Sequence, residues 1–272
     1  IDFYARPGKR GGAWMDSYRS RYKKADGTTQ LPVTYLVGNF TPAAEGEQAL
    51  LTHDDVQTIF HEFGHGIQEM LTQTDVKAVS GISGVSWDAV ELPSQFLENW
   101  CWDKEAVSLI SGHYQTGEAL SSDKLDKLIE AKNFNSALAM LRQLEFASFD
   151  FHLNIDYPTE KFISVDDTAY KIRRQTTVTP SLEKNRFHNS FTHIFSGGYS
   201  AGYYSYKWAE VLSADAFSRF EEEGIFNEET GRDFANTVLG EGGSRDAAEV
   251  FQSFRGRSPQ IDALLRHSGI TA

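Results

Sequence analysis

The feature that most constrains the fold is an apolar stripe of helical period over residues 53–73. Its members lie three or four positions apart, as residues on one face of a helix do: Val56, Ile59, Phe60, Phe63, Ile67, Met70 and Leu71. Thr52 precedes the stripe and Asp55 follows three residues later, a pairing that resembles a capping box. The sequence therefore predicts a helix over 53–73 that begins at Thr52.

Most of the remaining chain carries the same period. We predict a second helix between Asp88 and Ile110, after a glycine-punctuated loop over residues 80–86. Further helices are predicted over 123–131, 133–153, 166–175 and 201–223. Three dipeptides break the pattern between them: Tyr157-Pro158, Thr179-Pro180 and Gly197-Gly198.

Residues 1–50 carry strand and turn signals instead. Residues 33–37 predict a short strand bounded by Pro32 and Gly38, and residues 25–29 predict a turn that joins two strands. The predicted fold is mainly α with a small antiparallel β-sheet. We expect the sheet and turns in residues 1–50, and the helical part in residues 51–272.

Composition narrows the partners. The formal net charge of −12 repels nucleic acid and anionic membranes, so neither is expected to bind. The apolar runs are far shorter than the roughly 20 residues that span a bilayer. The single cysteine allows no internal disulfide, which favours a cytoplasmic location. The first residues form no signal peptide, and without an initiator Met the chain is expected to be a piece of a longer protein.

The predicted 53–73 helix contains His61-Glu62-Phe63-Gly64-His65, which fits the pattern H-E-x-x-H. A spacing of four places the two imidazoles about 40° apart on one face, one turn above the other. Two nitrogens so placed can bind one Zn²⁺ at about 2.0–2.1 Å each. Glu62 then lies where it can reach the attacking water rather than the metal. His61 and His65 are candidate metal ligands, and Glu62 is the candidate base.

Chance could also produce this pattern in a chain with eight histidines. Two observations argue against chance. The histidines lie off the apolar stripe, and Gly64 and Gly66 each cost about 1 kcal/mol relative to Ala inside a helix. Two such glycines indicate that another part of the protein approaches this backbone closely.

A catalytic zinc usually has a third protein ligand and a water. Asp88, Glu91 and Glu98 are the candidates, and spacing alone does not separate them. Asp88 is equally suited to cap a helix, although Pro93 favours a helix that begins near Leu92. Glu98 is either a carboxylate that steadies a ligand histidine or a member of a solvated helix face.

Several separated motifs together resemble the thimet oligopeptidase family of zinc peptidases. They are the residues 61–66 (H-E-F-G-H-G), the residues 79–100 (V-S-G-I-S-G-V-S-W-D-A-V-E-L-P-S-Q-F-L-E-N-W) and the closing residues 254–262 (F-R-G-R-S-P-Q-I-D). A glutamate would be more usual at Ser258. The resemblance covers essentially the whole chain, and it implies a gluzincin-type zinc metallopeptidase catalytic domain.

This resemblance implies that Glu91 is the third ligand of one Zn²⁺ per chain. It also implies that the chain is the C-terminal part of an enzyme more than twice as long. In the family, two helical halves enclose a channel that admits short peptides. The expected partners are therefore short peptide substrates and the missing N-terminal half of the same enzyme.

Residues 191–206 match a second motif of the family, a histidine followed by Gly-Gly-Tyr and Tyr-Tyr-x-Tyr. The resemblance assigns Tyr206 as the phenol that donates a hydrogen bond to the oxyanion of the reaction, with His193 as a further candidate. It assigns His193, Tyr199 and Tyr203 to contacts with the substrate backbone. Tyrosines at helical spacing can also be packing residues, and we prefer that interpretation for Tyr204.

The predicted function is hydrolysis of short peptides by a zinc-activated water with Glu62 as general base. Two alternatives stay open. An aminopeptidase can share H-E-x-x-H, but it needs a site for the substrate's N-terminal amine, and no motif for one is found. A zinc-stabilised peptide-binding module would need no catalytic residue, yet the chain contains the candidate base Glu62 as well as the three expected zinc ligands.

Overall fold

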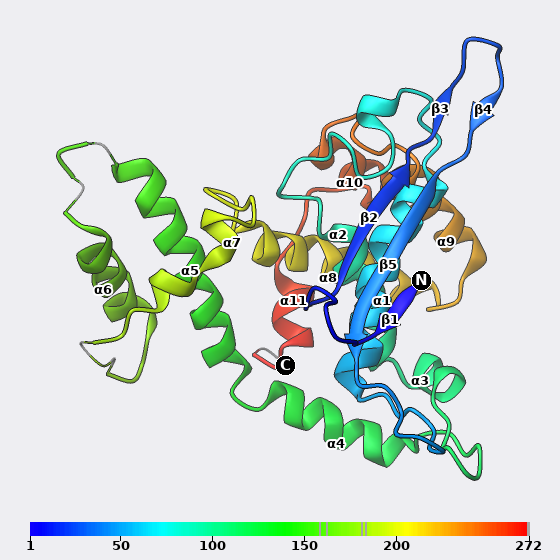
Figure 1. Ribbon diagram of the computed structural model, residues 1–272, viewed down its shortest axis with the longest axis horizontal. Coiled ribbons are helices and arrows are strands. Elements are labelled where there is room, and N and C mark those ends of the chain that lie inside the picture. The colour runs from blue at the N-terminus through cyan, green and yellow to red at the C-terminus, as the bar shows by residue number, and fades with distance from the viewer. Residues whose placement is uncertain (158, 162, 181, 183, 271–272) are drawn as a thin grey trace.

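The computed structural model describes residues 1–157, 159–161, 163–180, 182 and 184–270. Helices dominate it (Figure 1). They are α1 (His53–Leu71), α2 (Leu92–Glu98), α3 (Lys104–Ile110), α4 (Ser122–Asn133), α5 (Ser136–Asp156), α6 (Val165–Thr176), α7 (Thr192–Phe195), α8 (Ser205–Glu223), α9 (Glu228–Phe234), α10 (Ala247–Arg255) and α11 (Asp262–His267). The strands are β1 (Asp2–Tyr4), β2 (Trp14–Arg19), β3 (Tyr22–Lys23), β4 (Thr29–Gln30) and β5 (Val33–Phe40). The prediction of a mainly α fold with small sheets is confirmed.

The sheet differs from the prediction in one respect. β5 is the central strand of three, with β2 antiparallel on one side and β1 parallel on the other, so a purely antiparallel sheet is wrong. The reason is that the chain reverses twice, through β2, before β5 runs beside β1. The predicted 25–29 turn does join two strands, β3 and β4, which form a separate antiparallel pair. The N–H of Lys24 donates to the carbonyl of Thr28 there at 2.8 Å.

α1 begins as predicted. The Thr52 hydroxyl accepts from the Asp55 N–H at 3.1 Å, and the Asp55 carboxylate accepts from the Thr52 N–H at 2.9 Å. These two bonds satisfy free N–H groups of the first turn, which is the capping box expected from the sequence. The helix then lies against one face of the three-stranded sheet (Figure 1).

The predicted helix between residues 88 and 110 is two helices. α2 begins at Leu92 with Pro93 in its first turn, as the alternative register predicted, and it continues into a short 3₁₀ turn over Asn99–Trp102. Asp103 is extended, and its side chain accepts from the N–H groups of Glu105 and Ala106 to begin α3. Residues 179–180 and 197–198 are not helical, as predicted, whereas Pro158 lies outside the described residues.

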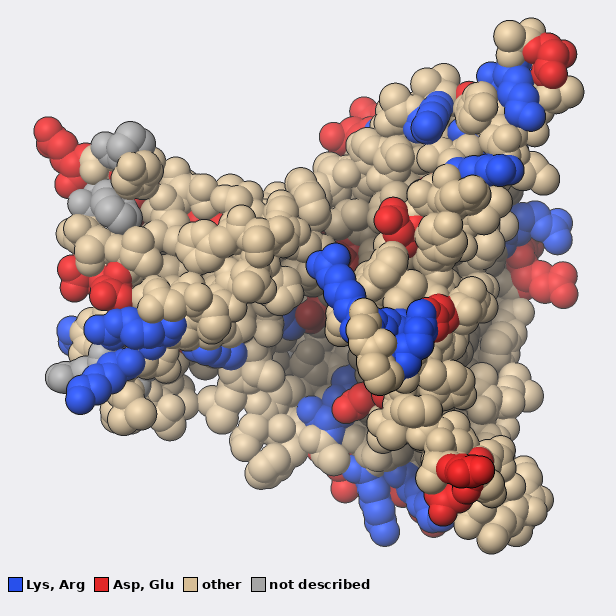
Figure 2. Space-filling view, viewed as in Figure 1, with Lys and Arg blue, Asp and Glu red and all other residues tan. Residues whose placement is uncertain are grey.

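Two large apolar clusters, and a smaller one between α8 and α11, pack the described helices together. The main core lies between α2, α8, α9 and α10. In it the rings of Phe96 and Phe234 stack, with their centroids 3.9 Å apart. A second cluster joins α5 and α6 to α7 and the start of α8, around Phe149 and Phe191. α5 and α6 project from the body as an arm, and the surface is notched between the arm and the body (Figure 2). No helix among the described residues has the length and apolarity to cross a bilayer.

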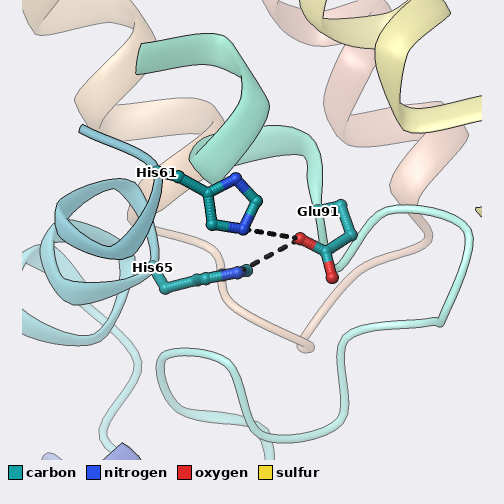
Figure 3. Close-up of side chains that lie close together, drawn as sticks. All are labelled: His61, His65 and Glu91. Atoms are coloured by element: carbon teal, nitrogen blue, oxygen red, sulfur yellow. Dashed lines mark ion pairs between the residues drawn. The ribbon is translucent and has the colours of Figure 1, made fainter. Parts of the chain in front are cut away.

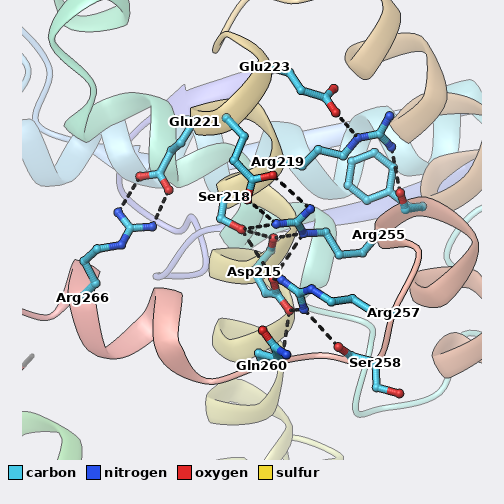
Figure 4. A network of polar contacts seen from close by, with 12 residues as sticks. Asp215, Ser218, Arg219, Glu221, Glu223, Arg255, Arg257, Ser258, Gln260 and Arg266 are labelled. Carbon is cyan, nitrogen blue, oxygen red and sulfur yellow. Dashed lines mark hydrogen bonds and ion pairs between the residues drawn. The ribbon is translucent and has the colours of Figure 1, made fainter.

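A buried carboxylate fastens the closing residues to α8 (Figure 4). Asp215 is 1% exposed and pairs with Arg257 through two bonds of 2.5 and 2.6 Å. It also accepts from the Gln260 N–H at 2.7 Å and from Arg255 Nε at 3.3 Å. Burial by itself raises the pKa of this carboxyl, but the arginines and the amide hydrogen bond lower it below its usual value.

We expect Asp215→Asn to lower the free energy of unfolding by about 3 kcal/mol at pH 7, because it removes the charge of a buried carboxylate that Arg257, Arg255 and the Gln260 N–H all contact. A carboxyl whose pKa is lowered on folding stabilises the protein at pH values above the pKa that this group has in the unfolded chain. That stabilisation is lost as the pH falls through the lower pKa of the folded state. The difference from the parent protein should therefore hold down to about pH 4, near the ordinary aspartate pKa of 3.8, and shrink below it. Urea unfolding at several pH values measures this.

Glu249→Gln is the matched control for Asp215→Asn. Glu249 is 67% exposed and lies 3.8 Å from Arg245, so its removal should change stability by less than about 0.5 kcal/mol. Equal losses in the two variants at pH 7 would show that the Asp215 network is no more than a set of surface ion pairs.

Candidate metal centre

The site depends on a close approach between α1 and α2. A Cβ atom at Gly64 would lie 2.3 Å from the Pro93 carbonyl oxygen and 2.5 Å from the Ser94 Cα, so only glycine fits there. At Gly66 a Cβ would lie 3.2 Å from the Leu36 side chain of β5. The close approach that the two glycines predicted is therefore confirmed. It brings Glu91, immediately before α2, beside the histidines of α1.

Three ligand atoms converge at this junction (Figure 3). Glu91 Oε2 lies 3.5 Å from His61 Nε2 and 3.2 Å from His65 Nε2. The three side chains form the one group of potential metal ligands found among the described residues, with ligand atoms within 4.8 Å of one another. Of the three carboxylates that spacing left open, Glu91 is thus the one beside both imidazoles.

The donor set can be tested against zinc. Atoms bound to one tetrahedral ion at about 2.0–2.1 Å lie roughly 3.3–3.4 Å apart. The two nitrogen–oxygen separations of 3.2 and 3.5 Å bracket that value. Two imidazole nitrogens and one carboxylate oxygen are also the ligands of one common class of catalytic zinc site. The residues fit a single zinc ion.

Two hydroxyl groups hold the Glu91 carboxylate, which is 3% exposed. Ser94 Oγ donates to Oε2 at 2.9 Å, and Tyr199 Oη donates to Oε1 at 2.8 Å. Burial raises the pKa of Glu91, but the neighbouring imidazoles and the Tyr199 hydrogen bond lower it to about 2. The carboxylate is therefore charged and oriented at neutral pH, as a metal ligand must be.

His61 has a second carboxylate on its other nitrogen. Glu98 Oε1 lies 2.6 Å from His61 Nδ1, and Gln57 donates to the remaining Glu98 oxygen. This arrangement favours the first of the two roles that sequence left open for Glu98, because such a carboxylate fixes the tautomer and orientation of a ligand histidine. His65 lacks this support: its Nδ1 is buried with no hydrogen-bond partner among the described residues.

Glu62 is buried at the edge of an open cavity. Its side chain, 6% exposed, lines a space of about 340 Å³ together with His61, Glu98 and three residues from the start of α1. Burial raises the pKa of Glu62, and the charge on His61 and His65 opposes this, leaving the pKa above its ordinary value. A carboxylate whose pKa is raised toward neutrality is better suited to accept and return a proton.

The segment over residues 196–204, here called the tyrosine loop, and the first turn of α8 each bring one phenol to the site. The rings of Tyr199 and Tyr206 stack with centroids 4.9 Å apart, and the Tyr199 hydroxyl is the one bonded to Glu91. Burial raises the pKa of both phenols, so both keep their protons at neutral pH. Tyr206 therefore remains a hydrogen-bond donor.

Among the described contacts, the other two residues of this motif make none to the metal ligands. The exposed His193 ring lies edge-on to Tyr206, with ring centroids 6.4 Å apart. Tyr203 is buried, and its hydroxyl donates to Gln143 of α5 at 3.0 Å. Its side chain thus packs between the loop and the arm. The substrate contacts assigned to His193 and Tyr203 stay predictions.

Sequence reasoning missed the residues that support the site. The bond from Tyr199 to the third ligand is one that the sequence did not predict. The substrate contact assigned to Tyr199 stays a prediction. Ser94 follows Glu91 by three residues, a spacing that could have suggested the contact. Trp87 packs on Tyr199 with ring centroids 4.5 Å apart; it belongs to the 79–100 motif, but no role was predicted for it.

The helical fold and the H-E-x-x-H centre together define a gluzincin-type metallopeptidase domain, and comparison with known proteins agrees. The model of peptidase family M3 matches residues 1–270. Oligopeptidase A of Salmonella typhimurium is 57% identical over 270 residues, covering 99% of this chain and 40% of that protein. The organellar oligopeptidase A of Arabidopsis thaliana is 48% identical over 280 residues, covering 100% of this chain and 35% of that protein. The solved structure of PZ peptidase A with inhibitor 2 shares the fold, with a TM-score of 0.64 at 16% identity over 98% of this chain and 42% of that one.

The chain therefore belongs to peptidase family M3, which confirms the family that the motifs suggested. The particular likeness to bacterial oligopeptidase A, which the same motifs favour, is confirmed as well. The chain spans about 40% of the length of these bacterial relatives. Its placement in the C-terminal part of such an enzyme stays a prediction.

Proposed function

We propose that this chain is the catalytic part of a zinc-dependent metalloendopeptidase that hydrolyses short peptides. The observation that carries the proposal is the convergence of His61 Nε2, His65 Nε2 and Glu91 Oε2 beside the buried carboxylate of Glu62. A protein that only bound the metal would need no more than the three ligands. The additional carboxylate, directly after the first of them, is what hydrolysis requires.

His61, His65 and Glu91 would hold one zinc ion. When bound, zinc lowers the pKa of a coordinated water toward 7 and polarises the scissile carbonyl. Glu62 takes the proton of the attacking water and later transfers it to the leaving amine. Tyr206 donates a hydrogen bond to the oxygen that becomes negatively charged, with His193 as a further candidate. Tyr199 and Glu98 keep two of the ligands in place.

We expect Tyr206→Phe to lower kcat about 100- to 1,000-fold with little change in KM, because the lost donor acts only once charge develops. Phenylalanine keeps the ring that stacks on Tyr199, so the loop should be preserved. Tyr204→Phe is the matched control. Its ring packs on Phe151 of the arm, and we expect kcat within about twofold. Equal rates in the Tyr206 variant and the parent enzyme would return Tyr206 to a packing role.

The proposed function is tested with the complete enzyme and quenched fluorescent peptides of increasing length. We expect cleavage of short peptides, loss of cleavage with a chelator, and recovery on adding about one equivalent of Zn²⁺. Mass spectrometry of the products separates internal cleavage from release of C-terminal dipeptides. Cleavage confined to the first residue would support an aminopeptidase instead. Zinc-dependent peptide binding with no product would support the peptide-binding module.

The proposal includes the setting of the enzyme. The substrates are short peptides, and the remaining part of the longer enzyme supplies the opposite wall of the channel. The chain covers only 40% of the length of the bacterial relatives, which supports the proposal that the complete enzyme has a further part. We propose a cytoplasmic location, with neither nucleic acid nor membrane as a partner.

A further inference from the structure

We propose that Asp150 is a positioning residue for the metal centre: it fixes the shape of the tyrosine loop and, through that loop, the orientation of Glu91. The inference rests on the proposed function for its catalytic readout. Asp150 lies on α5, in the arm, and none of its contacts is to a metal ligand. It is 0% exposed, yet no arginine or lysine pairs with it among the described contacts.

Backbone amides of the loop take the place of that counter-charge. Asp150 Oδ1 accepts from the Ala201 N–H at 2.9 Å, and Oδ2 accepts from the Tyr203 N–H at 3.0 Å. Asn154, one turn later on α5, donates to Oδ1 at 3.1 Å. A buried carboxylate is costly unless hydrogen bonds satisfy it, so these amides and the carboxylate require one another.

The loop needs such a clamp because its backbone is strained. Ala201 has a φ of +58°, a left-handed conformation that costs a residue with a Cβ atom about 1 kcal/mol or more. Between these two amides, the Gly202 N–H donates back to the Tyr199 carbonyl at 2.8 Å and closes the turn. The carboxylate thus compensates for the cost of this turn, which lies directly before α8 begins at Ser205.

The turn is connected to the metal centre by one contact at each of its ends. Tyr199 lies at one end of the turn and bonds to Glu91 at 2.8 Å. Tyr206 lies at the other end, and its carbonyl accepts from Gln95 of α2 at 3.2 Å. A turn that relaxes would move both phenols and free one oxygen of Glu91. Since the carboxylate that clamps the turn belongs to the arm, the arm and the metal centre are coupled through Asp150.

The test compares Asp150→Asn with Glu145→Gln in the complete, zinc-loaded enzyme. Asparagine keeps the volume but presents an NH₂ group to one of the loop amides. Glu145 is also a buried carboxylate of α5, but it pairs with Arg173 and Arg142, and none of its described contacts is to the tyrosine loop. We expect Asp150→Asn to lower kcat about 10- to 100-fold, with KM changed less than about threefold. Glu145→Gln should lower thermal stability and keep kcat within about threefold.

Two further measurements separate positioning from general destabilisation. Amide hydrogen exchange at Ala201 and Tyr203 should be at least about tenfold faster in Asp150→Asn than in the parent protein, and unchanged in Glu145→Gln. Adding Ala201→Gly to Asp150→Asn should restore kcat about three- to fivefold, because glycine adopts the left-handed conformation without strain.

Hydrogen exchange does not depend on catalysis, so the inference and the proposed function can fail separately. An inactive parent enzyme with the expected exchange pattern would refute the function alone. Equal kcat losses in Asp150→Asn and Glu145→Gln, or no change in exchange at Ala201 and Tyr203, would refute the positioning role of Asp150.

Discussion

Replacing Glu62 by Gln should leave zinc bound and lower kcat by about three to four orders of magnitude. Glutamine has the same shape and can still accept a hydrogen bond from water, but it cannot take the proton. General-base catalysis is worth about 10²–10⁴-fold, and the same carboxylate serves twice here, at attack and at departure of the amine. Because Glu62 is not one of the three converging ligands, zinc content should stay at one per chain.

The measurement is steady-state cleavage of a short peptide, together with metal analysis of the same sample. Asp54→Asn is a charge-matched control, since Asp54 lines the same cavity from the first turn of α1 and is not a member of the ligand group. We expect that control to keep kcat within about threefold. Turnover near the parent rate in Glu62→Gln would exclude Glu62 as the base.

The second large effect is expected for His65→Ala, which should reduce zinc to less than about one tenth of an equivalent per chain. Removing one of three protein ligands leaves an imidazole and a carboxylate, too few to hold the ion in a competitive buffer. His65 is also almost fully buried, so no solvent-exposed side chain can readily replace it. Activity should fall with the metal.

His152→Ala is the control for that experiment, because His152 pairs with Asp156 on the arm and takes no part in the ligand group. Plasma emission analysis after dialysis measures the zinc of both variants. One equivalent of zinc in His65→Ala would contradict the ligand assignment, whatever the activity.

Sequence alone predicted the local parts of this site. The spacing of His61 and His65 is a property of one helix, so their neighbourhood follows from the period of α1. The capping box at Thr52 is local as well, and the structure contains it. Gly64 predicted that another segment approaches α1 closely. The sequence could not identify that segment as the start of α2, because the contact joins residues far apart in the chain.

The position of Glu91 depends on tertiary structure. It is set by the path of the 80–86 loop, which Glu69 holds from α1 by accepting from the Ile82 N–H at 3.1 Å. Gly81 must be glycine for this, since a Cβ there would lie 1.9 Å from the Glu69 carboxylate. No periodicity reveals such a bond, so spacing could not choose between Asp88, Glu91 and Glu98. Only the family resemblance identified Glu91 as the expected third ligand.

The same limit explains the errors. The parallel pairing of β1 with β5 joins segments that three other strands separate in the chain, and alternation within one strand carries no information about its partner. Residues 201–204 carry helical spacing but form a turn, because their amides bind Asp150 of a distant helix. In both places a long-range hydrogen bond overrides the local pattern.

The most direct measurement of the central claim is a crystal structure of the zinc-loaded protein, with anomalous scattering recorded on both sides of the zinc absorption edge. We predict one anomalous peak, within about 2.0–2.2 Å of His61 Nε2, His65 Nε2 and one oxygen of Glu91. A peak elsewhere, or one that touches the two histidines while Glu91 points away, would contradict the account.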